Sequence, residues 1–228
     1  MKTIAFVLYP GITALDMVGP LQVMSVLAMF DPTYQAVVVA ETTEPLGTDT
    51  PLRLVPSHTF DQVPEPYALI VPGGGEPTFA AMADERLLER LRTAAATAEV
   101  VGSVCTGSLL LAAAGLLEGR RATSHWAAME FLAKLGAVPV SERVVEDGPF
   151  ITAAGVSAGI DMALLLTGRL AGEQMARTVQ LMIEYDPQPP HGPIDWPNVD
   201  RAAHASLITN TMSTALAGHP LLLERLTR

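Results

Sequence analysis

The chain contains a single cysteine, Cys105, whose neighbours are typical of a catalytic nucleophile. Apolar and β-branched residues lead into it over 100–104, and Thr106-Gly107-Ser108 follows before a leucine-rich helical pattern. A strand that turns sharply into a helix at a reactive side chain is a nucleophile elbow. The helix N-terminus would stabilise a thiolate through its unpaired N–H groups and its dipole. We therefore predict that Cys105 is an unusually acidic nucleophile; a buried structural cysteine is the alternative.

Three side chains near predicted strand ends are candidate partners of this thiol. Asp16 follows the first strand between apolar neighbours, and burial there would raise its pKa toward the range of proton transfer. Its alternative role is to cap the next helix. Thr106 directly follows the cysteine, where its N–H or hydroxyl would bind developing negative charge or position water. His125 follows a short strand and would orient the site or bind substrate, with helix capping or a hydrogen bond in the core as the alternative.

Three consecutive glycines, Gly73 to Gly75, follow an apolar strand predicted over 68–71. A glycine turn lets backbone N–H groups face a ligand without interference from side chains. We expect Gly74 and Gly75 to bind the substrate there; a flexible turn is the alternative.

The sequence gives no support for a metal, a nucleotide cofactor, a nucleic acid or a membrane. Its five histidines form no short ligand pair, and one cysteine cannot build a thiolate metal site. Neither a G-x-G-x-x-G motif nor a P-loop is present. The net charge of -10 argues against nucleic acid as a partner. No apolar stretch approaches the ~18 residues of a membrane span, and a single cysteine suits a reducing compartment, so we expect a cytoplasmic protein.

Predicted strands and helices alternate along the chain. Strands are expected over 4–8, 35–40, 52–55, 68–71, 100–104, 122–124, 138–140, 144–146 and 150–153, and helices over 19–30, 85–98, 109–117, 126–135, 155–170, 173–185 and 201–217. The first helix is expected to begin near Gly19, because Pro20 is tolerated at a helix start. This order predicts an α/β fold, a doubly wound and mostly parallel sheet with helices on both faces and ligands at the carboxyl ends of its strands. We expect one domain over 1–228, with a proline-rich loop over 186–200 before the last helix.

Several segments together resemble the DJ-1/PfpI superfamily. They are 70–74, 103–108, 113–126 and 155–161. Within the superfamily, 15–20 and 180–190 are most similar to the isonitrile (isocyanide) hydratases, and the resemblance covers roughly 4–190. It implies a flavodoxin-like sandwich of the class I glutamine amidotransferase-like type, usually a homodimer. It also implies that Cys105 is the nucleophile and Asp16 the acid–base residue.

The resemblance implies a carbon–nitrogen lyase that adds water to a small-molecule isonitrile and gives an N-substituted formamide. The intermediate would be a thioimidate on Cys105, with Asp16 moving protons and without cofactor or metal. Superfamily members with glyoxalase, deglycase or peptidase activity usually have Glu at the acid position, and the peptidases have His after the cysteine, so Asp16 and Thr106 favour a hydratase. Two departures are Ser124, where hydratases often have Thr, and Ala153-Ala154, where they often have glycines.

Two other functions stay open. One is a glyoxalase or deglycase of the same superfamily. The other is a non-catalytic domain that senses small molecules or oxidative stress, because the same motifs occur in amino-terminal domains of some transcription regulators. Those regulators carry a C-terminal helix-turn-helix region, for which we expect too few residues before Arg228.

Overall fold

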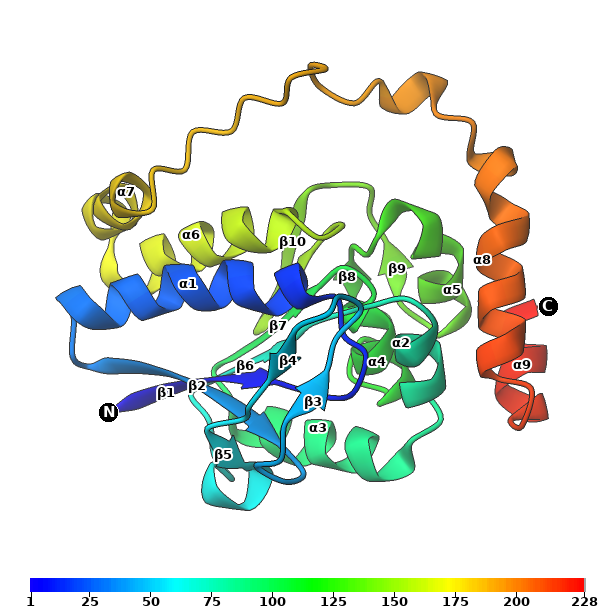
Figure 1. The fold of residues 1–228 in the computed structure, drawn as a ribbon, viewed down its shortest axis with the longest axis horizontal. Coiled ribbons are helices and arrows are strands. Elements are labelled where there is room, and N and C mark those ends of the chain that lie inside the picture. The colour runs from blue at the N-terminus through cyan, green and yellow to red at the C-terminus, as the bar shows by residue number, and fades with distance from the viewer. Residues whose placement is uncertain (228) are drawn as a thin grey trace.

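A seven-stranded sheet forms the centre of the computed structural model, which describes residues 1–227 (Figure 1). The strand order is β10-β11-β7-β6-β1-β2-β5, and every neighbouring pair is parallel except β10 and β11. The strands are β1 Lys2–Val7, β2 Tyr34–Ala40, β5 His58–Thr59, β6 Ala68–Val71, β7 Val100–Val104, β10 Val144–Asp147 and β11 Phe150–Ala153. Two small pairs lie outside this sheet: β3 Leu46–Gly47 with β4 Arg53–Leu54, and β8 Arg121–Ala122 with β9 Val138–Pro139.

Helices cover both faces of the sheet, as predicted for a doubly wound fold. On one face α1 (Ala14–Phe30) lies beside α6 (Ala158–Ala171), with α7 (Glu173–Met182) at their end (Figure 1). The other face carries α2 (Glu76–Ala81), α3 (Glu85–Thr97), α4 (Gly107–Ala113) and α5 (Met129–Lys134). The central strands β6 and β7 are buried along their whole length because helices cover them on both sides. The predicted fold class is confirmed.

The start of the first helix differs from the prediction. It begins at Ala14 rather than near Gly19, and Pro20 lies inside it. A proline has no N–H, so Pro20 cannot donate to the carbonyl of Asp16 four residues earlier. Tertiary packing outweighs this loss, since Pro20 is buried against Gly159 of α6, where an added Cβ would lie 3.2 Å from the proline ring.

The C-terminal region leaves the body after α7 and returns on the opposite side (Figure 1). The predicted proline-rich loop is present and almost wholly exposed up to a 3-10 turn, η3 (Trp196–Asn198). It leads into α8 (Arg201–Ala215), as predicted, and then into α9 (Pro220–Thr227), which was not predicted. None of the helices in residues 1–227 has both the length and the apolar character needed to cross a membrane.

Candidate active site

The nucleophile elbow is present at the carboxyl end of β7. Cys105 has a φ of 57°, in the left-handed region that residues other than glycine rarely adopt. Its N–H lies 3.1 Å from the carbonyl oxygen of Ala153 and 3.0 Å from that of Ala154, which fixes this conformation. Gly107 lets α4 begin against β6, because a Cβ there would lie only 2.1 Å from the carbonyl oxygen of Val71. The local sequence therefore places the thiol at the strand-to-helix turn.

Asp16 is fully buried in the first turn of α1 and faces the same site. Its Oδ2 accepts a hydrogen bond of 3.0 Å from the Gly73 N–H, across the carboxyl ends of β1 and β6. Its Oδ1 has no nitrogen or oxygen partner in the described chain, and the Cys105 thiol interacts with this carboxyl group. Thr13 occupies the N-cap position of α1 without a capping hydrogen bond from its side chain, and Asp16 lies inside the helix, so the structure does not use Asp16 as the helix cap.

Burial dominates the charge balance of this pair. It raises the pKa of Asp16 to about 7, although hydrogen bonds from Gly73 and Cys105 oppose the increase. Burial also raises the pKa of the Cys105 thiol to about 12, and the nearby Asp16 carboxylate adds to this effect. The backbone N–H groups of Val156 and Thr106 act in the opposite direction. The prediction of an unusually acidic resting thiol is therefore wrong, because desolvation outweighs the helix N-terminus.

Thr106 binds the glycine turn rather than open space. Its Oγ1 donates to the Gly74 carbonyl at 2.7 Å and accepts from the Gly74 N–H at 2.9 Å. Gly73 must be a glycine for this close approach, because an added Cβ would lie 2.5 Å from the Thr106 nitrogen. Gly75 is exposed and precedes α2. The Gly74 N–H is thus already paired, and substrate binding by Gly74 and Gly75 stays a prediction.

Tyr9 is a buried site residue that the sequence analysis missed. Its hydroxyl donates to the Pro72 carbonyl at 3.0 Å and lies 2.8 Å from Thr78 Oγ1. These contacts hold the turn whose Gly73 N–H reaches Asp16. A tyrosine after an apolar strand gives no sequence signal beyond its position at the strand end.

Val156 and Ser124 also contact the nucleophile. Val156 has a φ of 29°, a strained conformation for a β-branched residue, and its N–H interacts with the Cys105 thiol. Ser124 donates from Oγ to the Cys105 carbonyl at 3.1 Å. A serine at this position can therefore make this hydrogen bond without the methyl group of a threonine.

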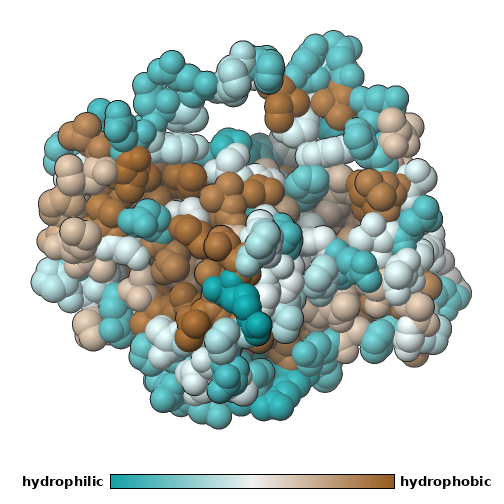
Figure 2. All heavy atoms as spheres, in the orientation of Figure 1, coloured by the Kyte–Doolittle hydropathy of each residue, from teal (hydrophilic) through white to brown (hydrophobic). Residues whose placement is uncertain are grey.

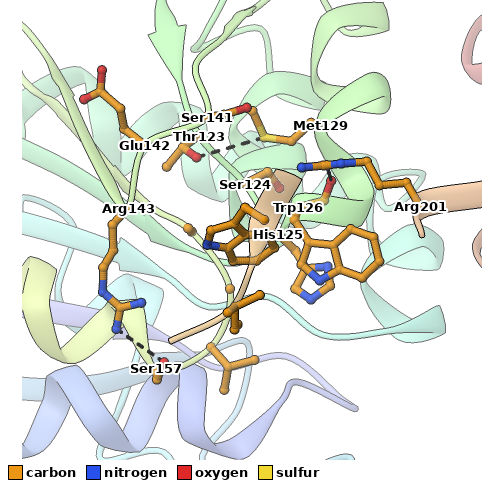
Figure 3. A pocket seen from close by; sticks show the side chains of 15 residues that line it. Thr123, Ser124, His125, Trp126, Met129, Ser141, Glu142, Arg143, Ser157 and Arg201 are labelled. Atoms are coloured by element: carbon orange, nitrogen blue, oxygen red, sulfur yellow. Dashed lines mark hydrogen bonds between the residues drawn. The ribbon is translucent and has the colours of Figure 1, made fainter. Parts of the chain in front are cut away.

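A cavity of about 480 Å³ lies beside this cluster, because Ser124 and Val156 are part of its lining. Figure 3 shows the side chains that line it. Its lining comes from 123–129, 141–143, 154–157 and the C-terminal segment 194–201. Among the predicted site residues only His125 lines it. The His125 Nδ1 also accepts from the Ala127 N–H at 3.4 Å, so the helix-capping alternative is realised as well. Burial lowers the pKa of His125, which favours the neutral ring needed for an acceptor. The described residues contain no cluster of three metal-ligating side chains.

Comparisons with known proteins agree with this geometry. Residues 2–168 match the model of the DJ-1/PfpI family. The chain is 46% identical over 187 residues to an isonitrile hydratase from Pseudomonas putida, covering 82% of this chain and 80% of that protein. It is 32% identical over 174 residues to the HTH-type transcriptional regulator CdhR of Pseudomonas aeruginosa, covering 75% of this chain and 51% of the regulator.

Among solved structures, a THiJ/PfpI family protein from Pseudomonas syringae superposes with a TM-score of 0.87 at 38% identity. The match covers 95% of this chain and 89% of that one. Family model, sequence similarity and structural similarity point in the same direction, and the chain belongs to the DJ-1/PfpI family.

Proposed function

We propose that this protein is an isonitrile hydratase, a carbon–nitrogen lyase that converts an isonitrile into an N-substituted formamide. The observation that carries the proposal is the buried pair of Cys105 and Asp16 at the elbow, beside a cavity. The similarity to the Pseudomonas putida isonitrile hydratase supports the choice of substrate. The reaction adds water and exchanges no electrons with a cofactor, so the proposed mechanism uses only side chains, backbone groups and water.

In the first step the sulfur of Cys105 forms a bond to the terminal carbon of R–N≡C. The thiol proton moves to the Asp16 carboxylate and from there to the same carbon, giving the thioimidate R–N=CH–S and restoring the carboxylate. A carboxyl group with a pKa of about 7 suits this transfer, because it accepts and releases a proton near neutral pH. The N–H groups of Val156 and Thr106 stabilise negative charge on the sulfur as its proton leaves.

In the second step Asp16 takes a proton from a water molecule whose oxygen attacks the thioimidate carbon. The nitrogen receives this proton, giving a tetrahedral R–NH–CH(OH)–S intermediate. The carbon–sulfur bond then breaks as the hydroxyl proton returns through Asp16 to the sulfur. The formamide R–NH–CHO leaves, and the pair regains its resting protonation state.

We also infer that the enzyme is a homodimer. Apolar residues gather over α1 and α6 on one face of the molecule (Figure 2). Leu15, Val18 and Leu165 are 40–47% exposed there, and an apolar surface patch is typical of a protein interface. Sedimentation should give twice the chain mass of 24.1 kDa, and Leu165→Glu should shift the measured mass toward that of the monomer.

We place the enzyme in the cytoplasm, because its one cysteine cannot form a disulfide within the chain.

A sensing domain is the second candidate, because the chain is also similar to the regulator CdhR. The two functions are separated by incubating the purified protein with a small panel of isonitriles and following the formamide by NMR. Methylglyoxal serves as the rival substrate for a glyoxalase. Catalytic formation of formamide supports the hydratase, whereas binding of isonitrile without turnover, or turnover of methylglyoxal alone, contradicts it.

A further inference from the structure

We infer that the cavity beside Cys105 holds the organic substituent of the isonitrile and selects uncharged aromatic substituents. Trp126 and Trp196 form its aromatic walls, and Trp196 is the specificity-determining residue. The inference rests on the proposed function and extends it from isonitriles in general to one class of them.

Both tryptophans of the chain line this one cavity. Aromatic residues make up only 5% of the sequence, yet Trp126 and Trp196 meet here from positions 70 residues apart. Trp196 is 45% exposed, so its indole is not part of the hydrophobic core. The short 3-10 turn in which it lies does not depend on an indole side chain either. Large rigid rings contribute contact area at little entropic cost, and aromatic pairs favour stacked or edge-to-face partners. Such walls therefore fit an aromatic ligand.

The C-terminal segment holds the aromatic walls in place. Trp126 packs edge-on against His204 of α8, with ring centroids 5.6 Å apart. Arg201 reaches in from α8 and lies 5.8 Å from the centre of the Trp126 ring (Figure 3). Its guanidinium also donates to the Trp126 carbonyl at 3.4 Å. The segment that ends the proline-rich loop therefore fixes the first wall and supplies the second.

The charged groups around the cavity are engaged with the protein. Arg143, on the side opposite Trp126, pairs with Asp161 at 2.5 Å and donates to Ser157 (Figure 3). Glu142 lies within 3.8 Å of Arg121 and points away from the other lining side chains. Arg143 and Glu142 have ion-pair partners, and Arg201 contacts the ring and the carbonyl of Trp126. Because these charged groups are engaged and the rest of the lining is largely apolar, the favoured substituent is uncharged.

The inner wall of the cavity is formed by residues that contact Cys105. Ser124, Ala154 and Val156 line it, and the same residues contact Cys105 through its carbonyl, its N–H and its thiol. A substituent in contact with the indoles would lie next to this wall, from which the isonitrile carbon would reach toward the thiol. The volume of about 480 Å³ is large for an ethyl group and lies in the range of ligand pockets, about 300–1,000 Å³.

The first test compares benzyl isonitrile with ethyl isonitrile as substrates. Wild type should prefer the benzyl compound in kcat/KM. Trp196→Ala should lower the benzyl-to-ethyl ratio at least about tenfold, the loss of roughly one aromatic contact, and Trp196→Phe should restore most of it. Ile194→Ala should also lower the ratio, whereas Leu207→Ala, an equally exposed aliphatic residue outside the cavity, should not. An unchanged ratio in Trp196→Ala overturns the inference.

The second test does not depend on turnover. Because the two tryptophans both line the cavity, their fluorescence, excited selectively over that of the four tyrosines, reports on this site. N-Benzylformamide should shift the tryptophan emission to shorter wavelength as water leaves the indoles, and N-ethylformamide at the same concentration should not. If wild type hydrates neither isonitrile, the proposed function fails, while this shift still decides whether the cavity binds aromatic groups. No shift with N-benzylformamide overturns the inference, whether or not the protein is a hydratase.

Discussion

Replacing Asp16 with asparagine should change the pH dependence of stability in a defined direction. Asp16 is fully buried, and its pKa rises from 3.8 to about 7 in the folded protein. The fold therefore favours the protonated carboxyl over the carboxylate. Its stabilising contribution is fully present below the unfolded pKa and is lost as the pH rises through about 7. At 1.36 kcal/mol for each pKa unit, the loss by pH 8 is on the order of 4 kcal/mol.

Asp16→Asn removes the ionisation and keeps an oxygen that can accept from the Gly73 N–H. Wild type should therefore lose stability between pH 4 and pH 8, by about 4 kcal/mol more than the variant. Urea unfolding of both proteins at several pH values measures this difference in slope. The test is how the free energy of unfolding changes with pH in each protein, and not the difference between the two proteins at any one pH. The new amide nitrogen has its own burial cost at every pH, which shifts the whole curve of the variant. The variant should also lose about 10²–10⁴ in isonitrile turnover, the contribution typical of an acid–base group.

Parallel pH profiles for the two proteins would show that Asp16 titrates normally, and the argument from burial would then be wrong. Undiminished turnover by Asp16→Asn would remove the carboxyl group from the mechanism. The two results are independent, so stability and catalysis test separate steps of the reasoning.

Three further predictions concern the surroundings of the thiol. Free Cys105 should react slowly with iodoacetamide at pH 7, and faster as the pH rises, because burial raises its pKa to about 12; rapid alkylation below pH 7 would contradict this. Thr106→Val should reduce turnover and lower stability by about 1–3 kcal/mol, since the Gly74 N–H and carbonyl lose their partner; kinetics and urea unfolding measure both effects. Tyr9→Phe should cost a similar 1–3 kcal/mol, roughly, through the lost bond to Pro72, and unchanged unfolding would show that this hydroxyl does not hold the turn.

The sequence predicts the sheet well where strands are buried on both faces. The apolar runs at 68–71 and 100–104 appear in the structure as β6 and β7 with the predicted bounds. The elbow could be predicted for a similar reason: small residues directly follow such an apolar run at Cys105. Short elements such as α2 and α9 carry too few residues for a helical period to stand out.

Tertiary packing explains what the sequence did not reveal. Pro20 by itself predicts a helix that starts near it, but the packing of Pro20 against Gly159 allows the helix to begin earlier. The pKa of Cys105 depends on how deeply the elbow is buried, which the helix N-terminus alone does not indicate. The role of Trp196 depends on the path of the proline-rich loop, which returns a distant segment to the cavity.

The central claim is that Cys105 forms a covalent thioimidate during hydration. Intact-mass spectrometry of wild type, quenched during turnover of benzyl isonitrile, tests it most directly. The account predicts a transient increase equal to one isonitrile, mapped to the peptide that contains Cys105, and neither adduct nor turnover in a folded Cys105→Ala variant. Formamide production by Cys105→Ala at the wild-type rate, or an adduct on another residue, would contradict the account.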